Sequence, residues 1–210
     1  MTLIYCYDAY CGWCYGFSEV MKKIHSTFKN ILATEVISGG MILPEEPVHI
    51  GATAAYIESV YKNVESVSGI KFGSDYLWHI KNPQQSDWYP NSEKPAIALC
   101  IFKEYYPDQQ VLFASDLQYA LHYEGRDLTD DEAYRHLVEK YDIPLEEFNA
   151  KLYDEFYKAE AYAEFDLCKN LQVTGFPAVL LQENESKFHL LARGYTDFET
   201  LDGRVKALLS

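Results

Sequence analysis

Two cysteines separated by two residues, Cys11 and Cys14, are the side chains of this sequence best suited to chemistry. A thiolate is both a nucleophile and a metal ligand, so such a pair serves either thiol-disulfide exchange or half of a metal site. A zinc site needs two further ligands, and the remaining cysteines and histidines are scattered without metal-ligand spacing. The spacing therefore favours redox chemistry, and we expect neither a bound metal nor a cofactor.

The segments around Cys11 and Cys14 indicate how one thiol would become reactive. An apolar run over 3–7 predicts a strand, and apolar residues at helical spacing predict a helix over 13–28. Cys11 would then lie at the helix N-terminus, where free N–H groups and the helix dipole stabilise an anion by about 1–2 kcal/mol and lower the pKa of a thiol toward about 7. We expect Cys11 to be the nucleophile and Cys14, which is more buried, to resolve the mixed disulfide.

A second motif, Thr174-Gly175-Phe176-Pro177, stands directly before another apolar run, 178–181. Most X-Pro bonds are trans, so an ordinary trans proline at a strand start is one interpretation. The position before a strand, with a Cys-x-x-Cys pair upstream, favours a cis bond instead. A cis bond would leave the backbone of Phe176 free to pair with an extended substrate.

Composition excludes several classes of function. The 210 residues carry a formal charge of −14, which repels nucleic acid and anionic membranes. No apolar run approaches the length of a membrane span, and the N-terminus lacks a basic region that would begin a secretory signal, so we expect a cytoplasmic protein. Five cysteines in a reducing compartment favour catalysis over a disulfide framework, and we interpret Cys6, Cys100 and Cys168 as core residues.

The wider pattern predicts a sheet interrupted by helices. A strand, helix and strand over 3–7, 13–28 and 31–37 form a crossover unit with parallel strands. Thr129 with Glu132, and Thr196 with Glu199, match helix capping boxes, and the polar segment 84–93 predicts a mobile loop. The helices expected after 40 are 49–62, 95–106, 109–124, 130–141, 144–157, 158–171 and 197–209, with strands 178–182 and 187–192 before the last of them.

The chain resembles the DsbA-like branch of the thioredoxin-like superfamily, in particular the cytosolic group that includes FrnE-like proteins and candidate protein-disulfide isomerases. The resemblance rests on the Cys11–Cys14 motif, on Ser38-Gly39-Gly40 and on the motif ending at Pro177. It implies an α/β, thioredoxin-like fold with an inserted all-helical domain. The thioredoxin-like domain would comprise 1–40 and 161–210, the insertion would span 41–160, and Pro177 would be a cis residue facing both cysteines.

The chain also departs from that family at three positions. Tyr5 stands where related proteins carry a buried acid that assists proton transfer. Asp8 is a possible substitute, although we favour a solvated turn former, the usual role of an aspartate at a strand end. The two residues between the cysteines lack the histidine of strongly oxidising members, so we expect a less oxidising centre. Phe176 is bulkier than the residue that usually precedes the proline.

We therefore expect a thiol-disulfide oxidoreductase in which Cys11, Cys14 and Pro177 are catalytic. Its partners would be protein or peptide thiols and disulfides, with glutathione as a further candidate. Two other functions compatible with the resemblance are a redox-linked adaptor and a glutathione-dependent isomerase of the kappa or 2-hydroxychromene-2-carboxylate type; a second cysteine argues against the latter. The residues expected to bind substrate at the cleft are Tyr10, Trp13, Tyr15, Thr174 and Phe176.

Overall fold

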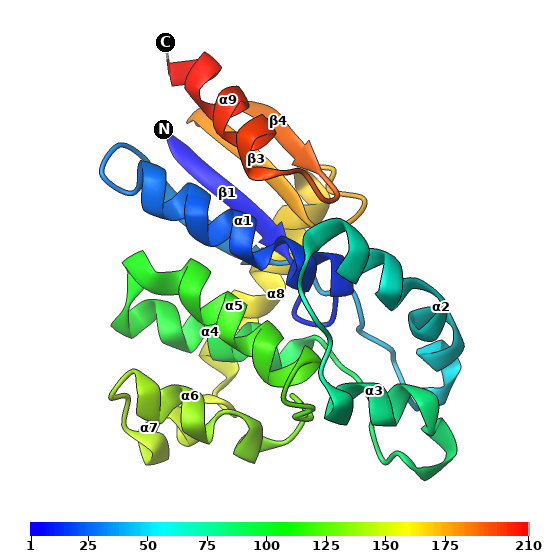
Figure 1. Cartoon of the computed structure of the whole chain (residues 1–210). Helices are drawn as coiled ribbons and strands as arrows, with labels where there is room; N and C mark the ends of the chain where they lie inside the picture. Colours follow the sequence, from blue (N-terminus) through cyan, green and yellow to red (C-terminus); the bar gives the residue numbers. More distant parts are fainter. Residues whose placement is uncertain (210) are drawn as a thin grey trace.

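The computed structural model describes residues 1–209. A four-stranded sheet in the order β2-β1-β3-β4 lies in the upper part of the view in Figure 1, above most of the helices. Strand β1 pairs in parallel with β2 and antiparallel with β3, which forms a hairpin with β4. The strands are β1 (Thr2–Tyr7), β2 (Ala33–Ser38), β3 (Ala178–Asn184) and β4 (Lys187–Arg193). The predicted α/β, thioredoxin-like fold is confirmed, with its parallel first pair and closing hairpin.

Side chains along β1 alternate between two apolar layers, because successive residues of a strand point to opposite faces. Tyr5 and Tyr7 belong to the larger core, which includes side chains of helices α1 (Gly12–Phe28) and α9 (Phe198–Leu209). Cys6 belongs to a smaller cluster under helix α8 (Glu155–Asn170). Helices thus cover both faces of the sheet.

Between β2 and α8, every regular element of the described chain is helical. Helix α5 packs along α1, and α4 packs against α8, so this part is joined directly to the sheet and its helices (Figure 1). The elements are α2 (Gly51–Ser68), α3 (Ser74–Lys81), α4 (Glu93–Tyr105), α5 (Gln110–His122), α6 (Arg135–Lys140) and α7 (Leu145–Lys151), with short 3-10 turns at Pro83–Gln85, Pro107–Gln109 and Asp131–Ala133.

A partly buried ion-pair network joins three of these elements. Lys103 of α4 donates to Glu35 of β2 at 2.8 Å and to Glu164 of α8 at 2.6 Å. Glu164 in turn accepts a hydrogen bond from the backbone N–H of Ser38 at 2.8 Å. The network therefore attaches α4 and α8 to the end of β2, next to the Ser38-Gly39-Gly40 segment.

Several helix boundaries differ from the predictions because local side chains cap the helices elsewhere. The expected helix over 144–157 ends with α7, and α8 begins at Glu155 after Asp154 accepts a hydrogen bond from the N–H of Phe156. Neither predicted capping box is present. Asp130, rather than Thr129, accepts from the N–H of Glu132, and Asp197 accepts from the N–H of Thr200.

The region around 70–93 was the least well predicted. Helix α3 was not expected, and α2 continues six residues past the predicted end at 62, to Ser68. In the segment 84–93, residues 86–92 are irregular and Glu93 begins α4, but Trp88 and Ser92 are buried in the protein. The carbonyl of Trp88 accepts a hydrogen bond from the N–H of Ile50, so this segment is attached to the start of α2.

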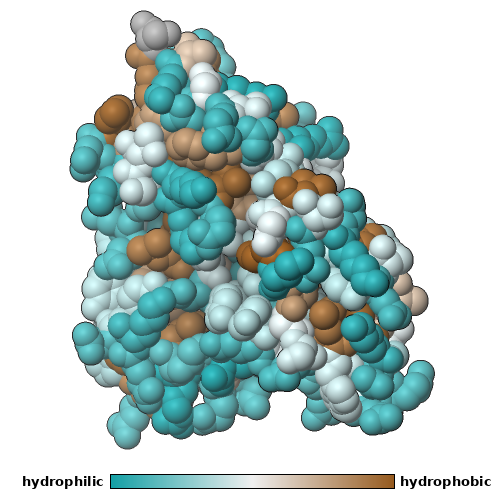
Figure 2. Space-filling model, in the orientation of Figure 1, coloured by the Kyte–Doolittle hydropathy of each residue, from teal (hydrophilic) through white to brown (hydrophobic). Residues whose placement is uncertain are grey.

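The surface agrees with the acidic composition. On the face shown in Figure 2, hydrophilic side chains cover most of the molecule and hydrophobic ones lie in small separate groups. None of the helices in residues 1–209 is long and apolar enough to cross a bilayer.

Candidate functional site

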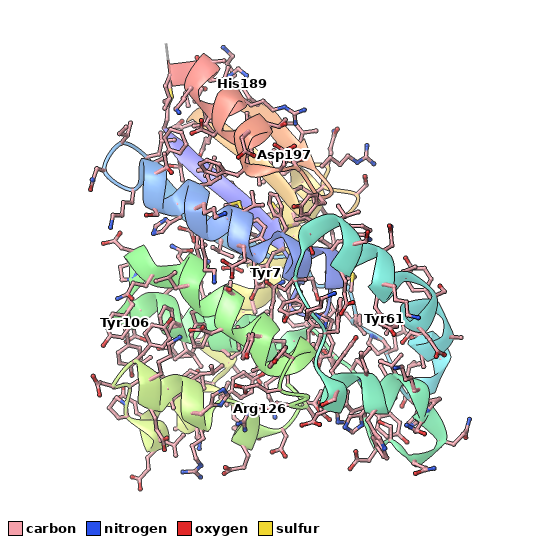
Figure 3. All side chains as sticks on the ribbon, viewed as in Figure 1. Tyr7, Tyr61, Tyr106, Arg126, His189 and Asp197 are labelled. Carbon is pink, nitrogen blue, oxygen red and sulfur yellow. The ribbon has the colours of Figure 1, made fainter. Side chains whose placement is uncertain are left out.

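The two cysteines of the first motif lie where β1 ends and α1 begins, near Tyr7 at the centre of Figure 3. Cys11 is the N-cap residue of α1 and has an extended backbone, while Cys14 lies in the first turn. A hydrogen bond from the N–H of Cys11 to the carbonyl of Asp8, at 3.1 Å, closes the turn between strand and helix. Both cysteines are buried, and all five cysteines of the described chain are free thiols.

The two thiols have opposite acidities. A hydrogen bond from the Cys14 thiol lowers the pKa of Cys11, and the backbone N–H groups of Cys14 and Trp13 act in the same direction, against the effect of burial. Burial raises the pKa of Cys14, and its contact with Cys11 raises that pKa further. Hydrogen bonds that favour the charged form stabilise the thiolate. Cys11 is therefore the thiol suited to attack, and Cys14 the one suited to remain protonated until needed.

The loop before β3 meets Cys11 from the other end of the chain. The Phe176–Pro177 peptide bond is cis, as expected. The Cys11 Sγ lies 3.6 Å from the carbonyl oxygen of Phe176, a residue 165 positions away in sequence. The sheet makes this contact possible, because β1 and β3 are neighbours and their active-site ends coincide at the Cys6–Ala178 pair. A backbone acceptor thus stands beside the reactive sulfur.

Gly39 makes room for this loop, a role that the sequence did not reveal. A Cβ atom at Gly39 would overlap the ring of Phe176. The bulky residue before Pro177 is therefore accommodated by a glycine in the Ser38-Gly39-Gly40 segment. No signal in the sequence identifies this role, because it depends on the distance between Gly39 and Phe176 in the folded protein. Gly40 has a φ of +62°, which glycine adopts without strain.

Asp8 is buried in the turn before Cys11, with 1% of its surface exposed. Its carboxylate accepts hydrogen bonds from the N–H of Met41 at 2.7 Å, the N–H of Tyr10 at 3.0 Å and the hydroxyl of Ser92 at 3.0 Å. The favoured interpretation of a solvated turn former is wrong, because three donors from separate segments enclose this carboxylate. Burial nevertheless raises the pKa of Asp8, and its charge opposes ionisation of Cys11.

The aromatic residues expected to line the cleft are not all at its surface. Trp13 is half-buried, with its ring centroid 6.5 Å from that of Tyr195, and Tyr10 is also half-buried. Tyr15 is only 2% exposed, and it stacks on His122 while its hydroxyl donates to the carbonyl of Lys71. The prediction that Tyr15 lies at the cleft is therefore wrong. Its position one turn into α1 directs it toward the helical part of the protein.

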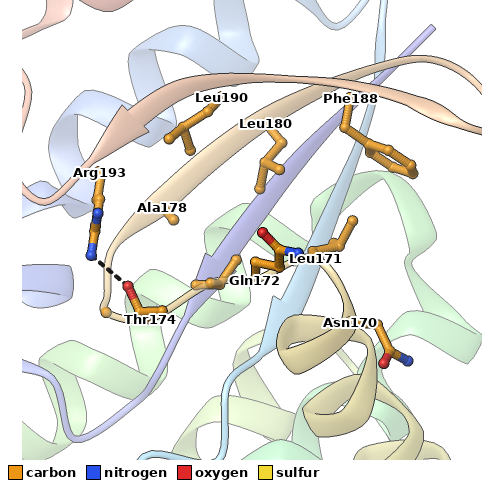
Figure 4. Close-up of a pocket in the computed structure, with 11 residues that line it drawn as sticks. Asn170, Leu171, Gln172, Thr174, Ala178, Leu180, Phe188, Leu190 and Arg193 are labelled. Atoms are coloured by element: carbon orange, nitrogen blue, oxygen red, sulfur yellow. Dashed lines mark hydrogen bonds between the residues drawn. The ribbon is translucent and has the colours of Figure 1, made fainter.

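A separate cavity of about 400 Å³ lies beside the same loop, between the C-terminal end of α8 and the hairpin of β3 and β4 (Figure 4). Thr174 lines it and accepts a hydrogen bond from Arg193, which ties the loop to β4. Neither Cys11 nor Cys14 lines this cavity. Thr174, a predicted substrate residue, therefore faces the cavity. Among residues 1–209, no group of three or more His, Cys, Asp or Glu side chains is arranged to hold a metal ion.

Comparison with known proteins gives one family and several similar folds. A family model described as DSBA-like thioredoxin domain matches residues 2–206. The chain is similar to a candidate protein disulfide isomerase from Nitrosomonas europaea, with 21% identity, a TM-score of 0.86 and coverage of 99% of this chain and 97% of that one. It is also similar to the cytosolic disulfide reductase DsbM from Pseudomonas aeruginosa, in a structure with GSH, with 23% identity, a TM-score of 0.76 and coverage of 100% and 98%.

More distant similarity extends to an enzyme of another class. A 2-hydroxychromene-2-carboxylate isomerase shares 11% identity with the chain at a TM-score of 0.67, with coverage of 100% of this chain and 96% of the other. A search of curated proteins found no match. At these identities the solved structures establish the fold and not the reaction.

Proposed function

Because the chain belongs to the DSBA-like thioredoxin domain family, we propose that it is a thiol-disulfide oxidoreductase whose reactive centre is the pair Cys11 and Cys14. The observation that carries this proposal is the opposite acidity of two adjacent thiols at one helix N-terminus. A single activated thiol would suffice for binding or for isomerisation. A second thiol held protonated beside it is needed only when a mixed disulfide must be resolved.

The proposed reaction transfers two electrons in two exchanges. The Cys11 thiolate attacks one sulfur of a substrate disulfide, so that its S–S bond breaks, a mixed disulfide forms and the other substrate sulfur leaves as a thiolate. Cys14 then loses its proton to that thiolate and attacks the Cys11 sulfur, which releases the second substrate thiol. The substrate is reduced to a dithiol and the pair is oxidised to a disulfide. The reverse sequence oxidises a dithiol.

We further propose that substrate binds along the loop 174–177. The carbonyl of Phe176 lies beside the Cys11 sulfur, where it can accept a hydrogen bond from an extended peptide whose disulfide is being attacked. The half-buried ring of Trp13, two residues after Cys11, offers an apolar contact. Pro177 is buried at the end of this loop and orients it.

Glutathione is our proposed small-thiol partner, and the cytoplasm our proposed compartment. The similarity to a cytosolic disulfide reductase whose structure contains GSH supports both. A glutathione-reduced pair would return to the dithiol state after each turnover, which suits a reductase.

The test is to trap the mixed disulfide. Cys14→Ser retains the nucleophile and lacks the resolving thiol, so it should accumulate covalent complexes with a peptide disulfide on non-reducing gels. Cys11→Ser should accumulate none. After incubation with oxidised glutathione, the peptide that contains Cys11 in Cys14→Ser should gain the mass of one glutathione. The corresponding peptide of Cys11→Ser should gain none. Equal trapping by both variants, or by neither, would contradict the proposed roles.

A further inference from the structure

Two further cysteines lie in contact on the other face of the sheet. Cys6 of β1 and Cys168 of α8 belong to a small apolar cluster, separate from the main core. The Cys168 thiol is close enough to hydrogen-bond with that of Cys6, and its Sγ lies 3.6 Å from the carbonyl oxygen of Ser38. The cluster consists of Ile4, Cys6, Ile37, Cys168, Ala178 and Leu180.

These two cysteines stand at opposite ends of the loop that reaches the active site. The carbonyl of Cys168 accepts a hydrogen bond from the N–H of Val173 at 3.0 Å, just before the loop begins. Cys6 is paired across the sheet with Ala178, the residue that follows Pro177. A covalent bond between the two sulfurs would therefore join the start of the loop to its end.

The cavity of Figure 4 borders this cluster, although neither Cys6 nor Cys168 lines it. Ala178 and Leu180 line the cavity and also belong to the cluster that contains both thiols. Leu171 and Val173 line the cavity as well and pack against the same cluster. With a volume of about 400 Å³, the cavity is ample for an oxidant as small as a peroxide.

We propose that Cys6 and Cys168 are a second dithiol-disulfide pair. Hydrogen peroxide oxidises the pair to a disulfide, which links α8 to β1 at the base of the loop 174–177. One thiol reacts with peroxide to give a sulfenic acid and water. The other thiol then attacks that sulfur, forms the S–S bond and releases a second water. Two thiols are thereby oxidised while one peroxide is reduced. A thiol such as glutathione reverses the step by exchange.

This pair should respond only after the first pair has reacted. Contact with Cys6, together with burial, raises the pKa of Cys168, so little of the reactive thiolate is present at neutral pH. Cys11 has a lowered pKa and should react first with the same oxidant. The disulfide between Cys6 and Cys168 would therefore form only under strong or prolonged oxidation. Its formation would alter the loop that carries Phe176.

The experiment uses the full chain with Cys11→Ser and Cys14→Ser, so that only Cys6, Cys100 and Cys168 remain. The folded variant is treated with hydrogen peroxide, free thiols are blocked, and peptides are mapped without reduction. We expect one cross-link, between the peptides of Cys6 and Cys168, that dithiothreitol removes. Adding Cys168→Ser should abolish it, and adding Cys100→Ser, the matched control at another buried thiol, should leave its yield unchanged.

Two outcomes would overturn the proposal. One is the absence of this cross-link from the folded protein, including the case in which it appears only in urea. The other is cross-linking to Cys100 in comparable yield, because random oxidation would produce that. Hydrogen exchange then tests the loop itself: amides over 171–176 should exchange several-fold more slowly after oxidation, while α5 serves as an internal reference. Unchanged exchange in a cross-linked sample would refute the tie at the base of the loop.

Discussion

The two thiol pairs of this protein differ in acidity although they are buried to a similar degree. Cys11 is 7% exposed and Cys168 is 2% exposed, yet the pKa of Cys11 is lowered and that of Cys168 is raised. The difference lies in their hydrogen-bond partners. Each sulfur lies 3.6 Å from a carbonyl oxygen, that of Phe176 for Cys11 and that of Ser38 for Cys168. Cys11 also accepts from a thiol and from N–H groups at a helix N-terminus, whereas the contact of Cys168 with the Cys6 thiol raises its pKa. Donors aimed at the sulfur, rather than exposure, decide which pair is reactive.

The largest expected effect separates the two pairs by activity. Cys11→Ser should slow reduction of a peptide disulfide by about 10³-fold or more, equal to at least about 4 kcal/mol of activation free energy, because no nucleophile remains. Cys168→Ser should stay within about twofold, a difference of less than about 1 kcal/mol. Turnover with glutathione as reductant measures both. A comparable loss of turnover in the two variants would contradict the assignment of Cys11 and Cys14 as the reactive pair.

The next effect concerns the loop that both pairs contact. Gly39→Ala should lower the free energy of unfolding by about 1–3 kcal/mol and slow turnover, because the new methyl group displaces the ring of Phe176, whose carbonyl lies beside Cys11. Gly175→Ala is the matched control, since a Cβ there meets no atom within 4 Å. Urea denaturation and turnover of both variants check this. Equal stability of the two variants would show that Phe176 adjusts without cost.

A third effect comes from the carboxylate beside the reactive pair. Asp8 has a raised pKa in the folded protein, so its contribution to stability is largest while it is protonated and falls as the pH rises from about 4 through that pKa. In Asp8→Asn this contribution is absent. The variant should be less stable by about 1–3 kcal/mol at pH 4, because an amide cannot accept from all three donors, and the gap should narrow toward neutral pH.

Urea denaturation of the wild type and of Asp8→Asn across this pH range measures the difference in their free energies of unfolding. Titration of distant groups affects both proteins equally and cancels in this difference. Alkylation of Cys11 in the same variant gives a second readout. Loss of the Asp8 charge should lower the pKa of Cys11 further, because that charge opposes thiolate formation. A gap that widens with pH would mean that Asp8 is stabilised as a carboxylate by its donors, contrary to the raised pKa.

The smallest effect tests the outer attachment of the loop. Thr174→Val removes the hydrogen bond from Arg193, and because both residues are exposed the loss should not exceed about 1 kcal/mol of unfolding free energy. Thr200→Val, which removes the hydroxyl that donates to Asp197 at the exposed start of α9, is a control of similar chemistry. Thermal denaturation compares them. A much larger loss for Thr174→Val would give this contact a role in shaping the loop.

Much of the fold follows from short-range pattern. The strands, the helix after Cys11 and the final hairpin were predicted within about two residues, because alternation and helical periodicity are local properties. The reactive pair was identifiable for the same reason, since Cys11 and Cys14 are separated by less than one helical turn. Helix α3 was missed, because it is stabilised by contacts such as that of Tyr76 with buried Trp88 rather than by a clear periodicity. The break before α8 was predicted between 157 and 158 instead of before Glu155, because the Asp154 cap rather than apolar periodicity sets it.

Sequence by itself determined which cysteine begins a helix and that a proline precedes β3, since each depends on neighbouring residues. Only the tertiary structure decided that Asp8 is enclosed by Met41 and Ser92. It also decided that Gly39 receives the ring of Phe176 and that Cys6 meets Cys168. These partners are more than 30 residues apart, and their contact depends on how the sheet orders β1, β2 and β3. Burial and hydrogen bonding, which set the acidity of each group, arise from those long-range contacts.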